Sequence, residues 1–325
     1  MADAEVEEPL ELQLEQYRRE LTGYCYRMLG SAAEAEDAVQ DAMIKAWRGR
    51  HGFEGRAALR SWLYRIATNV CLDALRSRKT RARPMDLGGP STVATASLTV
   101  LPEVTWIGPV PDARVVSEAG DPAELAAQRE SVRLALISAL QRLAPRQRAV
   151  LILREVLGWR ASEVADLLDS TVASVNSALQ RARATLAVQE VAATEPLRPL
   201  DQEQAALLTR YVRAFERYDM DGLTALLHEE VVMSMPPYEL WLRGHQDVRD
   251  WMLGPGAECR DSQLIATTAN GCPAYGQYKP GPDGGYTPWA LHVLELTGGR
   301  ITGLNFFLDT DALFPLFGLP AGLPA

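Results

Sequence analysis

Residues 162–183 have the sequence SEVADLLDSTVASVNSALQRAR, and this stretch decides how the middle of the chain folds. Apolar residues recur at helical spacing before and after a predicted turn at 169–171. These anchors are Val164, Ala165 and Leu168 before the turn and Val172, Val175 and Leu179 after it. Two short helices joined in this way are typical of a helix-turn-helix. An ordinary helical hairpin with a solvated outer face is the alternative interpretation.

Polar side chains cover the outer face of the second helix of this motif. Once the apolar anchors pack inward, the arginine, asparagine and glutamine side chains remain free to meet a DNA duplex. Arginine pairs with guanine edges, and asparagine or glutamine pairs with adenine. The candidate base-reading residues are Thr171, Ser174, Asn176, Ser177, Gln180 and Arg181.

The segment 12–83 predicts another all-α region. Its helical periodicity is broken near Gly30 and again across 49–55. Ser31 stands where it can cap the middle helix, and a glutamate follows three residues later. The last helix, expected over 57–77, has an apolar stripe on one face and arginines on the other.

Charge is distributed unevenly along a chain whose net charge is -9. Residues 56–83 hold eight basic residues and one acid, which favours contact with phosphates. Residues 200–325 hold eight basic residues and sixteen acids, so this part is a poor candidate for touching DNA. Trp62 lies among the arginines, and an aromatic ring in that setting can stack on an unpaired base. A place for Trp62 in the core is the alternative.

Composition excludes several classes of protein. A length of 325 residues predicts two or three domains, and no run of about 18 apolar residues predicts a membrane span. The acidic first 16 residues differ from a secretory signal, so we expect a cytoplasmic protein. The four scattered cysteines form no CxxC pair, which indicates free buried thiols and predicts neither a metal site nor a cofactor.

Two further segments complete the chain. Residues 84–120 are rich in proline, glycine, serine and threonine and predict an extended linker. Helical periodicity returns at Asp121, a good helix cap followed by proline, and continues to residue 191. Residues 200–325 begin with helical patterns and continue with apolar or alternating runs between turns, which predicts an α+β domain with an antiparallel sheet.

Three motifs together resemble the extracytoplasmic-function (ECF) group of sigma-70 family RNA polymerase sigma factors. They are AEAEDAVQDAMIKAWRGRHGF at 33–53, LRSWLYRIATNVCLDALRSR at 59–78 and LQRLAPRQRAVLILREVLGWRASEVADLLDSTVASVNSALQRAR at 140–183. The resemblance implies two all-α sigma domains, at 12–83 and 121–191, the second with the helix-turn-helix. It also implies promoter recognition and DNA melting in transcription initiation, with core RNA polymerase and promoter DNA as partners.

The resemblance assigns roles to residues of the first sigma domain. Docking on the β′ clamp helices of core polymerase, with further contact to β, is implied for Asp37, Gln40, Asp41 and Trp47. A solvated acidic face is the alternative for this group. Capture of the melted −10 strand is implied for the loop 52–60 and for Arg60, Trp62, Arg65, Asn69, Asp73, Arg76 and Arg78. The chain departs from the family at Asp169, where glycine is common, but aspartate tolerates left-handed backbone.

The C-terminal third is similar to the SnoaL-like domain, a cone-shaped α+β barrel that some sigma factors of this group carry. The matching segments are 207–237, 242–252, 289–296 and 300–309, and the linker phrase TWIGPVPD at 105–112 fits as well. The candidate pocket residues are Tyr238, Trp241, His245 and His292, and no acid/base pair emerges, so no catalytic residue is assigned. We expect this domain to regulate the sigma domains by contact within the chain. An enzyme of this barrel type fused to a DNA-targeting module, or a DNA-binding regulator that never binds polymerase, are the alternatives.

Overall fold

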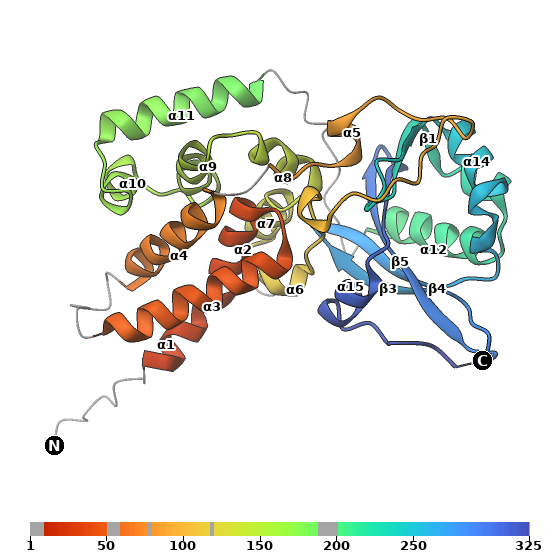
Figure 1. Ribbon diagram of the computed structural model, residues 1–325, viewed down its shortest axis with the longest axis horizontal. Helices are drawn as coiled ribbons and strands as arrows, with labels where there is room; N and C mark the ends of the chain where they lie inside the picture. The colour runs from red at the N-terminus through yellow and green to blue at the C-terminus, as the bar shows by residue number, and fades with distance from the viewer. Residues whose placement is uncertain (1–9, 51–58, 77–79, 118–119, 188–200, 325) are drawn as a thin grey trace. The chain divides into compact units, whose positions relative to one another are not determined.

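The computed structural model describes residues 10–50, 59–76, 80–117, 120–187 and 201–324. The chain forms two compact units, and each is built from separated stretches of sequence. The N-terminal unit comprises residues 1–80, 113–119 and 136–190, and the C-terminal unit comprises residues 81–112, 120–135 and 191–325. The described residues of the first unit form helices and no strand, whereas the second unit also contains a sheet (Figure 1).

The helices of the N-terminal unit follow the sequence pattern closely. They are α1 (Leu10–Gln16), α2 (Arg18–Leu29), α3 (Ala32–Gly49), α4 (Leu59–Leu75), α9 (Pro145–Leu151), the π-helical turn η4 (Ile152–Val156), α10 (Ala161–Leu167) and α11 (Val172–Ala187). The Ser31 side chain accepts a hydrogen bond from the Glu34 amide, which confirms the predicted cap of α3. Two short helices, α6 (Asp112–Val115) and α8 (Leu134–Gln141), lie where the chain passes between the units.

A buried arginine ties the two predicted sigma domains into one unit. The Arg148 guanidinium on α9 donates hydrogen bonds to the carbonyl of Met28 at the end of α2 and to the Gln141 side chain. Burial lowers the pKa of Arg148 to about 10, so the group remains charged at neutral pH. It satisfies carbonyls that have no partner within their own helices.

The C-terminal unit is built on a six-stranded sheet in the order β2-β1-β6-β5-β4-β3. Its strands are β1 (Leu227–Ser234), β2 (Trp241–Arg243), β3 (Gln263–Ala269), β4 (Cys272–Pro280), β5 (Tyr286–Thr297) and β6 (Arg300–Phe307). Every neighbouring pair is antiparallel except β1 and β6, which are parallel, so the expected wholly antiparallel sheet is wrong at this one pairing. Short turns join β3 through β6, but residues 235–299 separate β1 from β6 along the chain, and therefore no hairpin fixes the direction of this pair.

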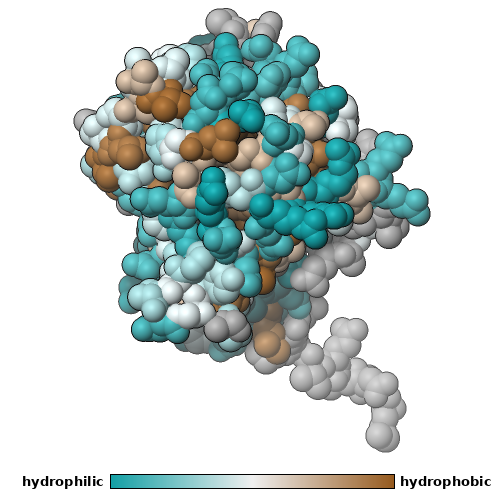
Figure 2. Space-filling model, turned by 90° about the vertical axis from the view of Figure 1, so that its right-hand side faces the viewer, coloured by the Kyte–Doolittle hydropathy of each residue, from teal (hydrophilic) through white to brown (hydrophobic). Residues whose placement is uncertain are grey.

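Helices complete the α+β fold. These are α12 (Gln202–Glu216), α13 (Met220–Thr224), α14 (His245–Leu253), the 3-10 turn η5 (Pro255–Cys259) and α15 (Thr310–Leu316). The α12 helix directs Leu207, Tyr211 and Phe215 into a core that it shares with α14 and the sheet. On the face of the molecule in Figure 2, hydrophobic residues gather in separate clusters among hydrophilic ones.

Most of the segment predicted as an extended linker, residues 84–112, belongs to the C-terminal unit. It contains the short helix α5 (Pro84–Leu87) and the 3-10 turn η3 (Glu103–Thr105), and in Figure 1 it runs beside α14 and β1. Its backbone is bound at several points: the Ser91 amide donates to the Trp241 carbonyl at 2.8 Å, and the Leu101 amide donates to the Pro237 carbonyl at 3.0 Å. The helix α7 (Pro122–Glu130), capped by Asp121 as predicted, also belongs to this unit.

Candidate nucleic-acid interface

The helix-turn-helix consists of α10 and α11, and its turn has the backbone that the sequence allows. Asp169 adopts φ 48°, the left-handed region where glycine is common and aspartate is tolerated. The Ser170 amide then donates to the Ala165 carbonyl at 2.9 Å. The Thr171 hydroxyl accepts from the Ser174 amide at 3.1 Å, so threonine rather than aspartate caps α11.

The outer face of α11 presents the predicted base-reading residues. Val175 and Leu179 are buried, whereas all six candidates are exposed. Arg183 pairs with Glu155 at 2.5 Å, but the Arg181 guanidinium forms no salt bridge with any residue that the structure describes. The helix therefore offers one unpaired cation in a row of short polar side chains.

The basic helix α4 is exposed along its candidate DNA face, but several of its side chains have partners. Of the predicted −10 residues, five are exposed: Arg60, Arg65, Asn69, Asp73 and Arg76. Trp62 is half-buried, and its ring lies against Gly49 at the end of α3. Arg78 and residues 52–58 of the predicted pocket loop lie outside the described residues.

The arginines of α4 are held by neighbours within the N-terminal unit. Arg60 donates to the Glu20 carboxylate at 2.9 Å, and Tyr64 donates to the same oxygen at 2.8 Å. Arg65 donates to the carbonyl of Asp166 on α10 at 2.8 Å. The Tyr64 and Trp159 rings pack with their centroids 5.0 Å apart. The basic helix thus contacts the helix-turn-helix side of the same unit.

The candidate polymerase-docking residues share the exposed face of α3. Asp37, Gln40, Asp41 and Trp47 are all exposed, at intervals of one to six residues. Ile44 lies on this face too and is 41% exposed, beside a Trp47 that is 39% exposed. The residues assigned to docking by the family resemblance did not include Ile44, although its position one turn after Asp41 could have revealed it. The face combines carboxylates with apolar anchors.

The four candidate pocket residues of the C-terminal unit have different surroundings. The Trp241 indole donates to the Gly88 carbonyl of the packed linker at 2.9 Å. Tyr238 forms an isolated antiparallel β-bridge with Val100. His245 begins α14. His292 is fully buried on β5, and its ring nitrogens bond the Tyr211 hydroxyl and the Gln277 amide oxygen, each at 2.9 Å. Burial lowers the pKa of His292 to about 3, so the ring is neutral.

A buried turn that the sequence did not single out joins the linker to the start of the second helical region. This 269–272 turn connects β3 to β4, and its Asn270 is fully buried at φ 56°. The Asn270 side chain accepts from the Val110 amide at 3.0 Å and donates to the Val132 carbonyl at 2.7 Å. Its own amide donates to the Val110 carbonyl at 3.1 Å. One asparagine therefore binds two segments of chain that are 22 residues apart in sequence.

The next residue in the turn must be glycine. Gly271 adopts φ 69°, and a Cβ atom added there would lie 2.5 Å from the Arg129 carbonyl oxygen. Its amide donates to the Asp112 carboxylate at 2.8 Å. Burial raises the pKa of Asp112 to about 6, against the opposing effects of that hydrogen bond and of Arg129 and Arg133.

Other predicted features can be placed briefly. Cys25, Cys71 and Cys272 are buried free thiols as predicted, and Cys259 is a half-buried one. Among the described residues, no group of three or more histidine, cysteine or acidic side chains is placed to hold a metal ion. Within the same residues, no helix is both long enough and apolar enough to cross a membrane.

Comparison with known proteins assigns families to three parts of the chain. Models match for Sigma-70 region 2 at 14–81, Sigma-70 region 4 at 133–186 and the SnoaL-like domain at 208–304. ECF RNA polymerase sigma factor SigG of Mycobacterium tuberculosis is 45% identical over 312 residues, which cover 95% of this chain and 83% of that protein. SigJ of the same organism is 27% identical over 311 residues, or 92% of this chain and 91% of SigJ. The crystal structure of SigJ has the same fold, with a TM-score of 0.61 at 24% identity over 96% of this chain and 99% of that one.

Proposed function

The chain belongs to the ECF family of RNA polymerase sigma factors, and on this premise we propose how its parts divide the work of initiation. Sigma factors of this family bind RNA polymerase, and regions 2 and 4 indicate promoter recognition. The family is not one of enzymes, although the SnoaL-like fold serves enzymes in other proteins. Our proposal assigns polymerase docking and −10 melting to 12–83, −35 recognition to 121–191, and regulation to 200–325 with the packed linker 84–120.

Docking on the β′ clamp helices, with further contact to β, is assigned to the exposed face of α3. Asp37 and Asp41 supply negative charge, while Ile44 and Trp47 supply exposed apolar surface beside it. Charge of one sign steers association with an oppositely charged partner, and buried apolar anchors then hold the complex. Both requirements are met on one helix face.

Capture of the melted −10 strand is assigned to α4, and it requires an exchange of partners. Arg60 and Arg65 now bond Glu20 and the Asp166 carbonyl, so DNA phosphates would have to replace these groups. DNA drives this exchange if it binds more tightly to the arrangement in which the two arginines have left these partners than to the arrangement in which they are bonded to them. Recognition of the −35 duplex is assigned to α11, whose reading face is already exposed.

One observation, the hydrogen bonding of the 269–272 turn, supports the proposal of regulation within the chain. Asn270 bonds the end of the linker at Val110 and the segment before α8 at Val132, all within the C-terminal unit. Residues 81–112 and 120–135 flank the segment 113–119 of the N-terminal unit. A domain that is hydrogen-bonded to the chain on both sides of the segment 113–119 can control how far the sigma regions separate. Because the domain is part of the same chain, its effective concentration near these regions is high.

Transcription with purified core RNA polymerase on a library of promoter DNA tests the function as a whole. We expect specific transcripts that depend on this protein. Asp41→Arg should weaken core binding about tenfold or more, because it reverses charge on the docking face without touching the core of α3. Asp283→Arg, at an exposed acid of the C-terminal unit, is the matched control for net charge.

Two results would overturn the proposal. Equal core binding by Asp41→Arg and the parent at physiological salt would show that α3 does not dock. Sequence-specific DNA binding without any association with core polymerase would favour the DNA-binding regulator instead.

A further inference from the structure

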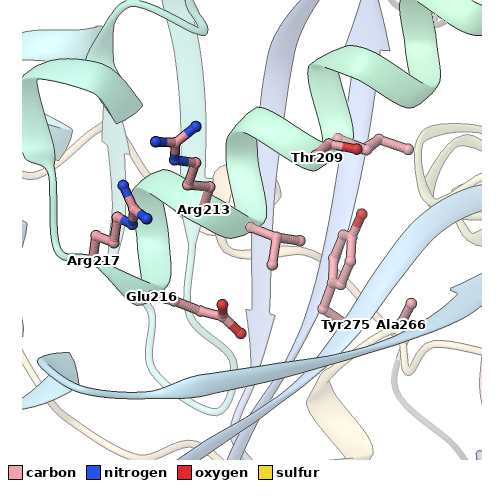
Figure 3. A pocket seen from close by; sticks show the side chains of 8 residues that line it. Thr209, Arg213, Glu216, Arg217, Ala266 and Tyr275 are labelled. Carbon is pink, nitrogen blue, oxygen red and sulfur yellow. The ribbon is translucent and has the colours of Figure 1, made fainter.

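A hollow of about 510 Å³ lies beside α12 in the C-terminal unit, and none of the four residues that the sequence had suggested for a pocket lines it. Figure 3 shows α12 on one side of it and the sheet on the other. Leu208 and Val212 on α12 and Ala266 on β3 give it an apolar wall. Small-molecule sites typically have roughly 300–1,000 Å³, a mainly apolar lining and a few polar groups. This hollow has that size and that lining.

Two arginines on one face of α12 stand at the hollow without a neutralising partner. Arg213 and Arg217 lie side by side in Figure 3, one helical turn apart. Neither forms a salt bridge with a residue that the structure describes. Glu216, between them in sequence, also lines the hollow, and its Oε1 accepts a hydrogen bond from the Leu264 amide at 3.0 Å. Two like charges at this spacing destabilise a helix slightly, so an anion that binds both is favoured.

The hydroxyl of a largely buried tyrosine supplies the third polar group. Tyr275 on β4 is only 6% exposed, and its hydroxyl has no hydrogen-bond partner among the described residues. In Figure 3 this hydroxyl points across the hollow toward α12, near Thr209. Burial raises the pKa of Tyr275 to about 12, so the group is a hydrogen-bond donor at neutral pH.

We propose that this hollow binds a small amphipathic carboxylate, an organic acid with an apolar ring body. Its carboxylate pairs with Arg213 and Arg217, its ring lies against Leu208, Val212 and the Tyr275 ring, and an acceptor atom meets the Tyr275 hydroxyl. Two of the eight basic residues after residue 200 lie on α12 and a third directly follows it, so this anion site stands in an otherwise acidic part of the chain. The buried His292 is distinct from it, because both of its ring nitrogens are already bonded. The inference goes beyond the proposed role in transcription and does not depend on it.

Calorimetric titration of the full-length protein with 1-naphthoate, and with the neutral 1-naphthalenemethanol of the same ring, tests the site without polymerase. We expect naphthoate to bind about tenfold more tightly than the alcohol, since charge-assisted hydrogen bonds to arginine distinguish the two. The double variant Arg213→Gln/Arg217→Gln should abolish that preference. Arg210→Gln, an exposed arginine of the same helix outside the hollow, should keep it.

Two measurements keep the test independent of how the variants fold. Tyr275→Phe removes only a hydroxyl and should weaken naphthoate binding severalfold. In the parent protein, naphthoate should protect Arg213 and Arg217, but not Arg210, from modification by phenylglyoxal, as read by mass spectrometry. Equal affinity for acid and alcohol, no naphthoate binding at millimolar concentration, or equal protection of all three arginines would overturn the proposal. Since no step uses polymerase or DNA, that failure is distinct from a failure of the proposed function.

Discussion

The base-reading face of α11 and the 269–272 turn place polar side chains in opposite environments, one exposed and the other buried. On α11 the six candidate residues are exposed, and Arg181 has no salt-bridge partner in the described chain. In the turn, Asn270 is fully buried and its side chain bonds Val110 and Val132. An exposed polar residue contributes little to folding and is available to a ligand. A buried one that loses its partners costs about 1–3 kcal/mol for each unsatisfied group.

This difference explains what residue types in a sequence can reveal. Arginine, asparagine and glutamine on the outer face of a predicted helix indicate function because nothing in the fold requires them there. Asn270 resembles any turn residue, since asparagine before glycine is common in tight hairpins. Its role depends on two segments more than 130 residues away, at Val110 and Val132, which local patterns do not reveal.

The largest expected effect is on stability, at the turn. Asn270→Gly permits the same φ 56° but removes both side-chain hydrogen bonds, so the free energy of unfolding of the C-terminal unit should fall by about 2–3 kcal/mol. Urea denaturation checks this, and faster amide hydrogen exchange across 105–112 and 128–134 should accompany it. Asn176→Ala on α11 should change stability by less than about 0.5 kcal/mol. Equal losses in both variants would remove the contrast between the two regions.

The next effect is on DNA affinity, at α11. Arg181→Ala should weaken binding to −35 duplex by about tenfold while the melting temperature stays unchanged, because the side chain is exposed. Arg183→Ala is the matched control, since that arginine is already paired with Glu155. Fluorescence anisotropy with labelled duplex measures both variants. If the two lose affinity equally, α11 attracts DNA by charge alone and does not read bases.

The smallest effect concerns pH at the turn. The pKa of Asp112 is raised to about 6 in the folded protein by burial, so between about pH 4 and 6 the folded state binds more protons than the unfolded one. The contribution of this group to stability is therefore present at low pH and lost as the pH rises through 6. Asp112→Asn keeps an acceptor for the Gly271 amide and removes the buried charge.

Calorimetry should detect this change. At pH 7.5 the variant should unfold a few degrees higher than the parent, which corresponds to about 1 kcal/mol, and near pH 4.5 the two should nearly agree. A variant that is less stable at both values would mean that the attraction of Arg129 and Arg133 outweighs the burial of the charge.

Local signals predicted most of the secondary structure. The caps Ser31 and Asp121, the left-handed Asp169 and the strands from 263 to 307 follow from short-range patterns, and the structure has each of them. The parallel pairing of β1 with β6 did not follow, because no hairpin joins these strands. The linker was recognised as non-helical, but its packing on the C-terminal unit depends on long-range backbone bonds such as Ser91 to Trp241.

For the candidate sites, too, short-range patterns predicted some features, and others depend on long-range contacts. Residue type and spacing found the exposed face of α11, and the family resemblance supplied the residues on the exposed faces of α3 and, apart from the half-buried Trp62, of α4. They did not show that Arg60 and Arg65 already have partners within the unit, nor that Tyr275 is left without one. Whether a polar group is engaged is decided by neighbours distant in sequence. Short-range patterns therefore locate such groups without telling whether they are free.

Promoter-specific transcription at equal occupancy of core polymerase tests most directly whether the C-terminal unit controls the sigma regions through the 269–272 turn. The proteins compared are the parent, Asn270→Gly and Gln263→Ala, the last an exposed residue of the same unit outside the turn. We predict that Asn270→Gly changes the transcript yield severalfold while Gln263→Ala matches the parent. Equal yields from all three proteins, with Asn270→Gly folded and its 105–112 amides exchanging faster, would contradict regulation through this turn.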